Sequence, residues 1–297
     1  MTPNPPVRVT LPMLHATYAN FTAKTHHTPQ NRCLFLAFGV LNHFFGRDWV
    51  ERHLENPGYL QIDETNQDTM DVAALRVIDL AECVYNLQHI ENFDGVIQRM
   101  KEGHVEATAA ELDLGRMLFL NHVSFRYIKP QGVKGKDYDA EITFPDGLVV
   151  CADAKCAMER SDMKEKAISN KLEKARQKLP SDKPGMIFAK VPAHWMDEPD
   201  FAETTIDQAN ELFRQSQRIV SIKFYVAPTS IKDGYATQLH AYKELNNPKT
   251  RFGSRDWTLF RPFDQVNAGR TMPAHWQRIL FFPDGPPYIG PPPAKGN

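Results

Sequence analysis

The fold is decided by one stretch, YDAEITFPDGLVVCADAK, which occupies residues 138–155. Its first part, 138–144, alternates polar and apolar residues as a half-buried strand does, and Pro-Asp-Gly at 145–147 is a tight-turn signal. Residues 148–155 are nearly all apolar until their end, which is typical of a central strand buried on both faces. The stretch therefore predicts two neighbouring strands joined by a hairpin.

Charged residues interrupt both predicted strands. Side chains alternate along a strand, so Asp153 and Lys155 point the same way, and Asp139 and Glu141 share a face of the preceding strand. Uncompensated charges inside a sheet cost several kcal/mol each, so they need partners or a metal ion. Oxygen ligands without His or Cys nearby favour Mg²⁺ or Mn²⁺, and Lys155 could contact an attacking water. The pattern predicts a hydrolase that acts on a phosphate ester.

The surrounding pattern predicts an α/β fold. From residue 104 onward the expected order is α-β-β-β-α-β-α-β, which predicts a mixed β-sheet flanked by helices. The expected helices are 106–120, 159–179 and 202–217, and the expected strands are 123–128, 138–144, 148–155, 186–191 and 219–226. Residues 257–262 are a further candidate strand.

The first hundred residues read as an α-helical N-terminal region. Apolar periodicity and helix breakers predict helices at 29–45, from the N-cap Asp48 until Pro57, at 69–90, and at 95–101 with Gly103 as the stop. A chain of 297 residues is long enough for one large or two ordinary domains. We therefore expect a helical region at 1–103, an α/β domain at 104–270 and a proline-rich tail at 271–297.

The residues resemble a known pattern at this point. Glu111 on a helix, Asp139 on the second strand and Asp153-Ala154-Lys155 on the third are similar to the PD-(D/E)XK, or restriction-endonuclease-like, nuclease superfamily. The resemblance covers the α-β-β-β-α-β order from 104 to about 191, less than half of the chain. It implies that Asp139 and Asp153 bind Mg²⁺ or Mn²⁺ through carboxylates and Ala154 through its carbonyl. Glu111 would assist from the helix, and Lys155 would orient and activate the water.

Two positions depart from that pattern. Tyr138 stands where proline is usual, and residue 153 is Asp where Glu is the commoner occupant. The structural alternative is that Asp153 and Lys155 form an ordinary solvated ion pair at a strand end. The strand context, rather than the short motif, favours the nuclease interpretation.

Two acidic residues are further candidates for the site. Glu106 and Glu111 are five residues apart and so project about 140° apart, which prevents both from facing the site. Glu111 is favoured as the helix residue that faces the site, because Leu114 and Leu118 follow it at helical spacing. Glu106 is the second candidate for that position. Glu141 is either a further site member or a charge paired with Lys155.

The expected helix at 159–179 is basic. Residues 160–190 carry nine Lys or Arg against four Asp or Glu, in a chain with 35 basic and 36 acidic residues. Lysines beside a metal site could neutralise phosphates and bind nucleic acid, although an ordinary solvated helix face is the alternative. The candidate nucleic-acid-binding residues are Lys164, Lys171, Lys174 and Lys178, with Lys134 and Lys136 from the loop before the second strand.

Composition and charge narrow the functional classes that remain possible. Net charge is close to zero, so a polyanion must be bound by a local patch. The four cysteines have no zinc-type spacing, and no apolar run reaches the ~20 residues needed to cross a bilayer. We expect a cytoplasmic Mg²⁺-dependent nuclease that acts on DNA, with a homodimer contact or protein partner at its helical region. The alternative is a catalytically inactive nuclease-fold protein that binds nucleic acid or a protein.

Overall fold

The computed structural model describes residues 7–22, 29–56, 58–62, 67–133, 135–157, 161–232 and 235–260. These residues fall into two compact units, a helical unit that ends at His89 and a sheet unit that spans Ile90–Pro262. The tail expected at 271–297 lies outside the described residues, as does Lys134 of the loop before the second strand.

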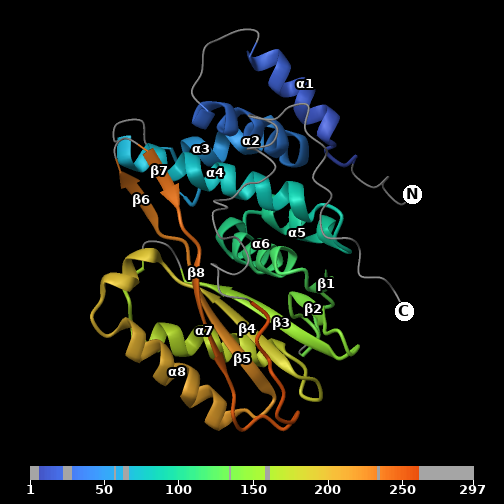
Figure 1. Ribbon diagram of the computed structural model, residues 1–297, viewed down its shortest axis with the longest axis vertical. Helices are drawn as coiled ribbons and strands as arrows, with labels where there is room; N and C mark the ends of the chain where they lie inside the picture. Colours follow the sequence, from blue (N-terminus) through green and yellow to red (C-terminus); the bar gives the residue numbers. More distant parts are fainter. Residues whose placement is uncertain are drawn as a thin grey trace. The chain divides into compact units, whose positions relative to one another are not determined.

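The helical unit consists of four helices, labelled in Figure 1. They are α1 (Leu11–Thr22), α2 (Pro29–Phe45), α3 (Arg47–Glu55) and α4 (Gln67–Leu87). The Gln88 side chain both accepts from the Val9 N–H at 2.8 Å and donates to the Val9 carbonyl at 2.9 Å, which fixes the chain just before α1. Periodicity predicted α2 with its observed bounds, whereas α1 was not predicted.

The sheet unit contains a mixed sheet of six strands in the order β1-β2-β3-β4-β5-β8. Strands β1, β2 and β3 are antiparallel neighbours, β3, β4 and β5 are parallel, and β8 closes the far edge antiparallel to β5. Strands β6 and β7 form a separate hairpin. The bounds are β1 (Ser124–Tyr127), β2 (Ala140–Thr143), β3 (Val149–Cys156), β4 (Gly185–Lys190), β5 (Ile219–Val226), β6 (Thr229–Lys232), β7 (Tyr235–Gln238) and β8 (Ala241–Asn246).

Helices cover both faces of this sheet (Figure 1). On one face α6 (Val105–Leu120), which packs against α5 (Phe93–Lys101), contributes Leu114 and Leu118 to a core that also contains Val150 and Ala152. On the other face α7 (Glu165–Lys178) and α8 (Phe201–Gln215) bury Leu172 in a core that contains Cys151. Because β3 alternates between the two cores, it is buried on both sides, as its apolar run predicted.

The turn between β2 and β3 has the expected chemistry. Gly147 adopts a φ of 82°, which only glycine adopts without cost, and the Asp146 carboxylate accepts the Leu148 N–H at 3.3 Å. The Gly147 N–H donates to the Phe144 carbonyl at 2.9 Å. These bonds close the hairpin that brings residue 139 beside residue 153.

The predicted α/β class with a mixed sheet flanked by helices is confirmed, and several elements differ in detail. Helix α7 begins at Glu165, later than the expected 159. Over 257–260 the chain is irregular rather than a strand, because Trp257 and Phe260 are buried as side chains against the sheet. A short 3₁₀ helix, η1 (Ala193–Asp197), precedes α8. None of the described helices combines the length and apolarity needed to cross a membrane.

Candidate metal centre

Strands β2 and β3 separate at the predicted site. Their pairing ends with Ala140 opposite Ala152, and the Asp139 N–H donates to the Ala152 carbonyl at 2.9 Å. Two residues further along β3, the Ala154 N–H donates to Oδ2 of Asp139 at 2.7 Å, so a carboxylate takes the place of a strand partner. A strand residue directs its N–H and its C=O to the same side, so the Ala154 carbonyl also faces this opening.

Asp153 lies on β3, beside the point where the two strands separate. Its side chain is fully buried, and the Lys155 ammonium pairs with Oδ2. Among the described residues, Oδ1 of Asp153 accepts no hydrogen bond, and Nζ of Lys178 is 3.7 Å from it. Burial, followed by the charge of Asp139, raises the pKa of Asp153 well above its ordinary value. Lys155 and Lys178 therefore do not fully offset the cost of burying this carboxylate beside Asp139.

Glu111 reaches the same group from α6. It is buried and pairs with Arg99 of α5. Burial and then the charge of Asp139 raise the pKa of Glu111 to about 7, although Arg99 and Lys178 oppose the shift. The predicted choice between the two glutamates agrees with these contacts, because Glu106 lies in the first turn of α6 and is partly exposed.

Lys155 contacts both the Asp153 carboxylate and the main chain of β3. Its Nζ pairs with Asp153 and also donates to the Ala154 carbonyl oxygen at 3.1 Å. Only 14% of its side chain is exposed, so the ammonium is held at the opening rather than in solvent. The residues at 153 and 155 therefore lie together, as strand alternation predicted.

Lys178, at the end of α7, reaches further into the site than the sequence indicated. Burial lowers the pKa of this ammonium, but the charges of Asp153, Asp139 and Glu111 outweigh it and raise the pKa. The sequence assigned Lys178 to a phosphate-binding row. Its position among the carboxylates depends on the crossover from β3 through α7, a long-range arrangement that periodicity does not reveal.

The site suits a hard divalent cation. Glu111, Asp139 and Asp153 supply carboxylate oxygens and Ala154 supplies a carbonyl oxygen, which is the ligand chemistry of Mg²⁺ or Mn²⁺. The unbonded Oδ1 of Asp153 is the observation that favours such an ion. In the structure, no choice of one carboxylate oxygen from each of these three acids places all three oxygens within 4.8 Å of one another. The three side chains must therefore move closer together to bind a single ion.

Glu141 belongs to a different group, which corrects both interpretations offered for it. Its carboxylate pairs with Arg126 at 2.6 Å, accepts the Tyr138 hydroxyl at 2.7 Å and lies 3.5 Å from Lys183. Glu141 therefore does not pair with Lys155, and its partners are not those of Asp139 and Asp153.

The remaining basic candidates lie at or near the surface. Lys164 precedes α7 and is exposed, Lys174 is exposed on α7, and Lys171 is partly buried there. Lys136 is exposed in the loop before β2. Their assignment to nucleic-acid binding stays a prediction.

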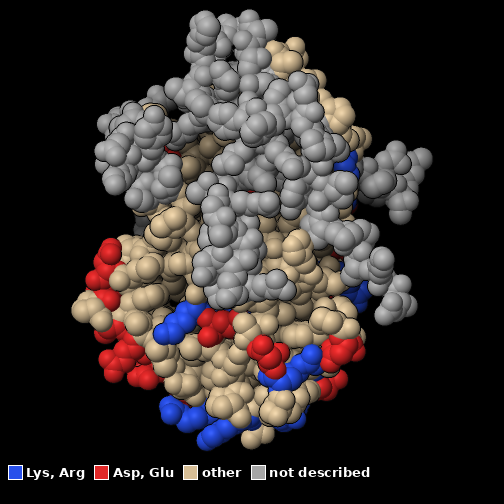
Figure 2. Space-filling model, viewed as in Figure 1, with Lys and Arg blue, Asp and Glu red and all other residues tan. Residues whose placement is uncertain are grey.

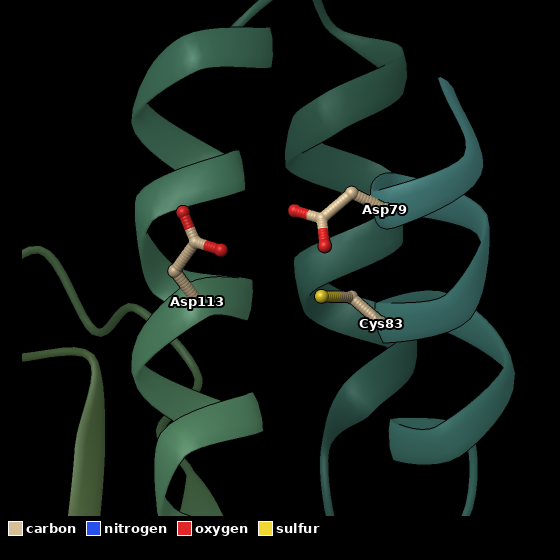
Figure 3. Close-up of side chains that lie close together, drawn as sticks. All are labelled: Asp79, Cys83 and Asp113. Carbon is tan, nitrogen blue, oxygen red and sulfur yellow. The ribbon is translucent and has the colours of Figure 1, made fainter. Parts of the chain in front are cut away.

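Three other acidic or thiol side chains, drawn in Figure 3, were not singled out from the sequence. Asp79 and Cys83 lie one turn apart on α4 of the helical unit. Asp113 lies on α6 of the sheet unit, where Arg116 at 2.8 Å and Lys190 at 2.6 Å neutralise it. Within the sheet unit, Asp113 therefore acts as one member of a buried ion network.

Comparisons of the chain with models of protein families, with curated proteins and with solved structures found no match.

Proposed function

We propose that the protein is a metal-dependent nuclease of the PD-(D/E)XK type that hydrolyses phosphodiester bonds of DNA. The observation that carries this proposal is the opening between β2 and β3, where Asp139 and Asp153 meet beside the Ala154 carbonyl and Lys155. Carboxylates, a carbonyl and an ammonium in this arrangement have the groups needed to hold a dication and an attacking water.

Each residue has a distinct role in the proposed hydrolysis. Asp139, Asp153 and the Ala154 carbonyl would hold Mg²⁺ or Mn²⁺, which supplies Lewis acidity at the scissile phosphate. The Lys155 ammonium, 3.1 Å from the Ala154 oxygen, is placed to orient the attacking water. Glu111, with its pKa raised to about 7, is suited to accept a proton near neutral pH.

The element order supports the same proposal. From α6 the chain runs α6-β1-β2-β3-α7-β4, the order implied by the resemblance to the PD-(D/E)XK superfamily. Site residues come from α6, from the residue before β2 and from the end of β3, as that pattern implies. Because one fold hosts many functions, the proposal rests on the site rather than on the order alone.

Helix α7 is the proposed contact for the DNA backbone. Lys171, Lys174 and Lys178 follow one another at spacings of three and four residues, so they share one side of the helix. Lys and Arg alternate with Asp and Glu on the face of the sheet unit drawn in Figure 2. A local row of lysines, rather than the whole surface, would then attract the polyanion.

The second candidate is a catalytically inactive protein of the same fold that binds nucleic acid or a protein. The observation that favours it is the ion pairing of Asp153 with Lys155 and its proximity to Lys178, which could neutralise the acid without a metal. This candidate predicts DNA binding that is indifferent to EDTA and is not followed by cleavage.

Cleavage of supercoiled plasmid with and without Mg²⁺ separates the two candidates. We expect Mg²⁺-dependent nicking that falls by a factor on the order of 100 or more in Asp153→Asn and in Lys155→Met. Asp207→Asn, an exposed acid on α8, is the matched control and should retain wild-type activity. Activity that persists in both site variants refutes the assignment, and the absence of cleavage by the wild type favours the inactive protein.

A further inference from the structure

Lys178 lies in the position of an internal counter-ion. Its Nζ is 3.7 Å from Oδ1 of Asp153, the buried oxygen that accepts no hydrogen bond among the described residues. The charges of Asp139 and Glu111 act on the same ammonium. We propose that Lys178 is the cation that a divalent ion displaces, so that this side chain sets the metal affinity of the site, an inference that rests on the proposed metal centre.

The balance of charge supports displacement. Three carboxylates, Glu111, Asp139 and Asp153, face three cations, since Arg99 pairs with Glu111, Lys155 pairs with Asp153, and Lys178 lies beside Asp153. A dication added to this balanced set repels the cations already present, and the repulsion is strong where burial excludes water. One ammonium must therefore move away when the ion binds.

Lys178 is the cation that can move at least cost. Its side chain is 45% exposed, compared with 14% for Lys155 and 20% for Arg99. It is also the last residue of α7, and a long flexible stem lets its ammonium turn toward solvent. Arg99 makes a direct ion pair with Glu111, and Lys155 also contacts the Ala154 carbonyl, so both are held more firmly.

Displacement of Lys178 would couple metal binding to substrate binding. The released ammonium remains beside the centre, next to Lys174 on the same side of α7, where it can pair with a phosphate oxygen. Metal loading then changes the partner of Lys178 from a carboxylate to the substrate. Lys178 is in this account both a competitor of the ion and a phosphate contact.

Calorimetric titration of the full-length chain with Mn²⁺ tests this inference. Removing a competing cation should tighten Mn²⁺ binding by about threefold or more in Lys178→Met, and by a similar factor in Lys178→Gln. Lys166→Met removes an exposed lysine near the start of the same helix, so it is the matched control and should bind Mn²⁺ within about twofold of the wild type. Circular dichroism verifies that each variant is folded.

The outcomes separate this inference from the proposed function. Unchanged or weaker Mn²⁺ binding in both Lys178 variants, with normal binding by the wild type, overturns the role of Lys178 and leaves the metal site intact. An equal tightening in Lys166→Met also overturns it, because a general loss of positive charge would then be sufficient. Absence of Mn²⁺ binding by the wild type, or undiminished binding by Asp153→Asn, refutes the metal centre and with it this inference.

Discussion

At the scale of single residues, the site is maintained at a cost to stability. Asp153 is fully buried and near another carboxylate, and its raised pKa shows that the surroundings disfavour its charge despite Lys155. Functional sites often hold such destabilised groups because the chemistry requires them. Asp153 would be such a group in the proposed metal centre.

Asp153→Asn should therefore separate stability from activity. The neutral amide removes the buried charge and its repulsion with Asp139, so metal-free protein at pH 8 should unfold with a free energy about 1 kcal/mol higher than the wild type. Cleavage should be lost in the same variant. Urea unfolding in EDTA measures the first effect, and a destabilised variant would show that the pairing with Lys155 outweighs the cost of burial.

Some site residues could be predicted from the sequence, and the reason is local geometry. Alternation along β3 places Asp153 with Lys155, and helical spacing favours Glu111 over Glu106. Glu141 was misplaced because its partners, Arg126 of β1 and Tyr138, are set by strand pairing and by the chain before β2, which its own alternation does not reveal. The position of Lys178 depends on a crossover between distant segments, which no local pattern encodes.

At the scale of elements, β8 was missed because its sequence resembles a loop. Ala-Tyr-Lys-Glu-Leu-Asn at 241–246 is short and half polar, yet it pairs with all but the first two residues of β5. A buried ion pair links the two strands, with Nζ of Lys223 2.6 Å from Oε1 of Glu244. The Ser221 hydroxyl also donates to this carboxylate, at 3.5 Å.

Breaking that pair from one side should be costly. Glu244→Ala leaves the Lys223 ammonium buried without its carboxylate, so the free energy of unfolding should fall by about 3 kcal/mol or more. The double variant Lys223→Met, Glu244→Leu removes both charges and should lie within about 1 kcal/mol of the wild type. Urea unfolding checks both, and a double variant as unstable as Glu244→Ala would contradict the argument.

A second buried network makes the sheet unit sensitive to acid. Nδ1 of His240 is 2.6 Å from the Tyr225 hydroxyl and 3.0 Å from a nitrogen of Arg116. Burial first, and then the charge of Arg116, lower the pKa of His240 well below 6.5, while Asp113 opposes the shift and Lys190 adds to it. The folded protein therefore resists protonation that the unfolded chain accepts.

The expected consequence is a loss of stability as pH falls below about 6.5, the value at which an unfolded histidine titrates. Above that pH the contribution of His240 is fully present, because both states hold the ring neutral. His240→Gln, which can keep a hydrogen bond to Tyr225, should flatten the difference in urea stability between pH 7.5 and pH 5. The same slope in both proteins would contradict the assignment.

At the scale of the whole molecule, the charge is almost balanced, with 35 basic and 36 acidic residues. If the protein binds DNA as proposed, its affinity must depend on few lysines. If Lys171, Lys174 and Lys178 each contact one phosphate, the logarithm of the DNA-binding constant should fall with the logarithm of the salt concentration at a slope of about −3. Lys174→Met should reduce the magnitude of that slope by about one. Titration of metal-free Asp153→Asn protein, which should not cleave, measures it. A slope near zero would exclude this row as the DNA contact.

The central claim is that β2 and β3 deliver two carboxylates to one cation. A crystal grown with Mn²⁺ and measured at a wavelength where manganese scatters anomalously tests it most directly. We predict a single strong peak within coordination distance of Asp139, Asp153 and the Ala154 carbonyl oxygen, with Lys178 turned away from Asp153. Manganese bound elsewhere, with Asp153 still paired to Lys155 and Lys178, would contradict the account.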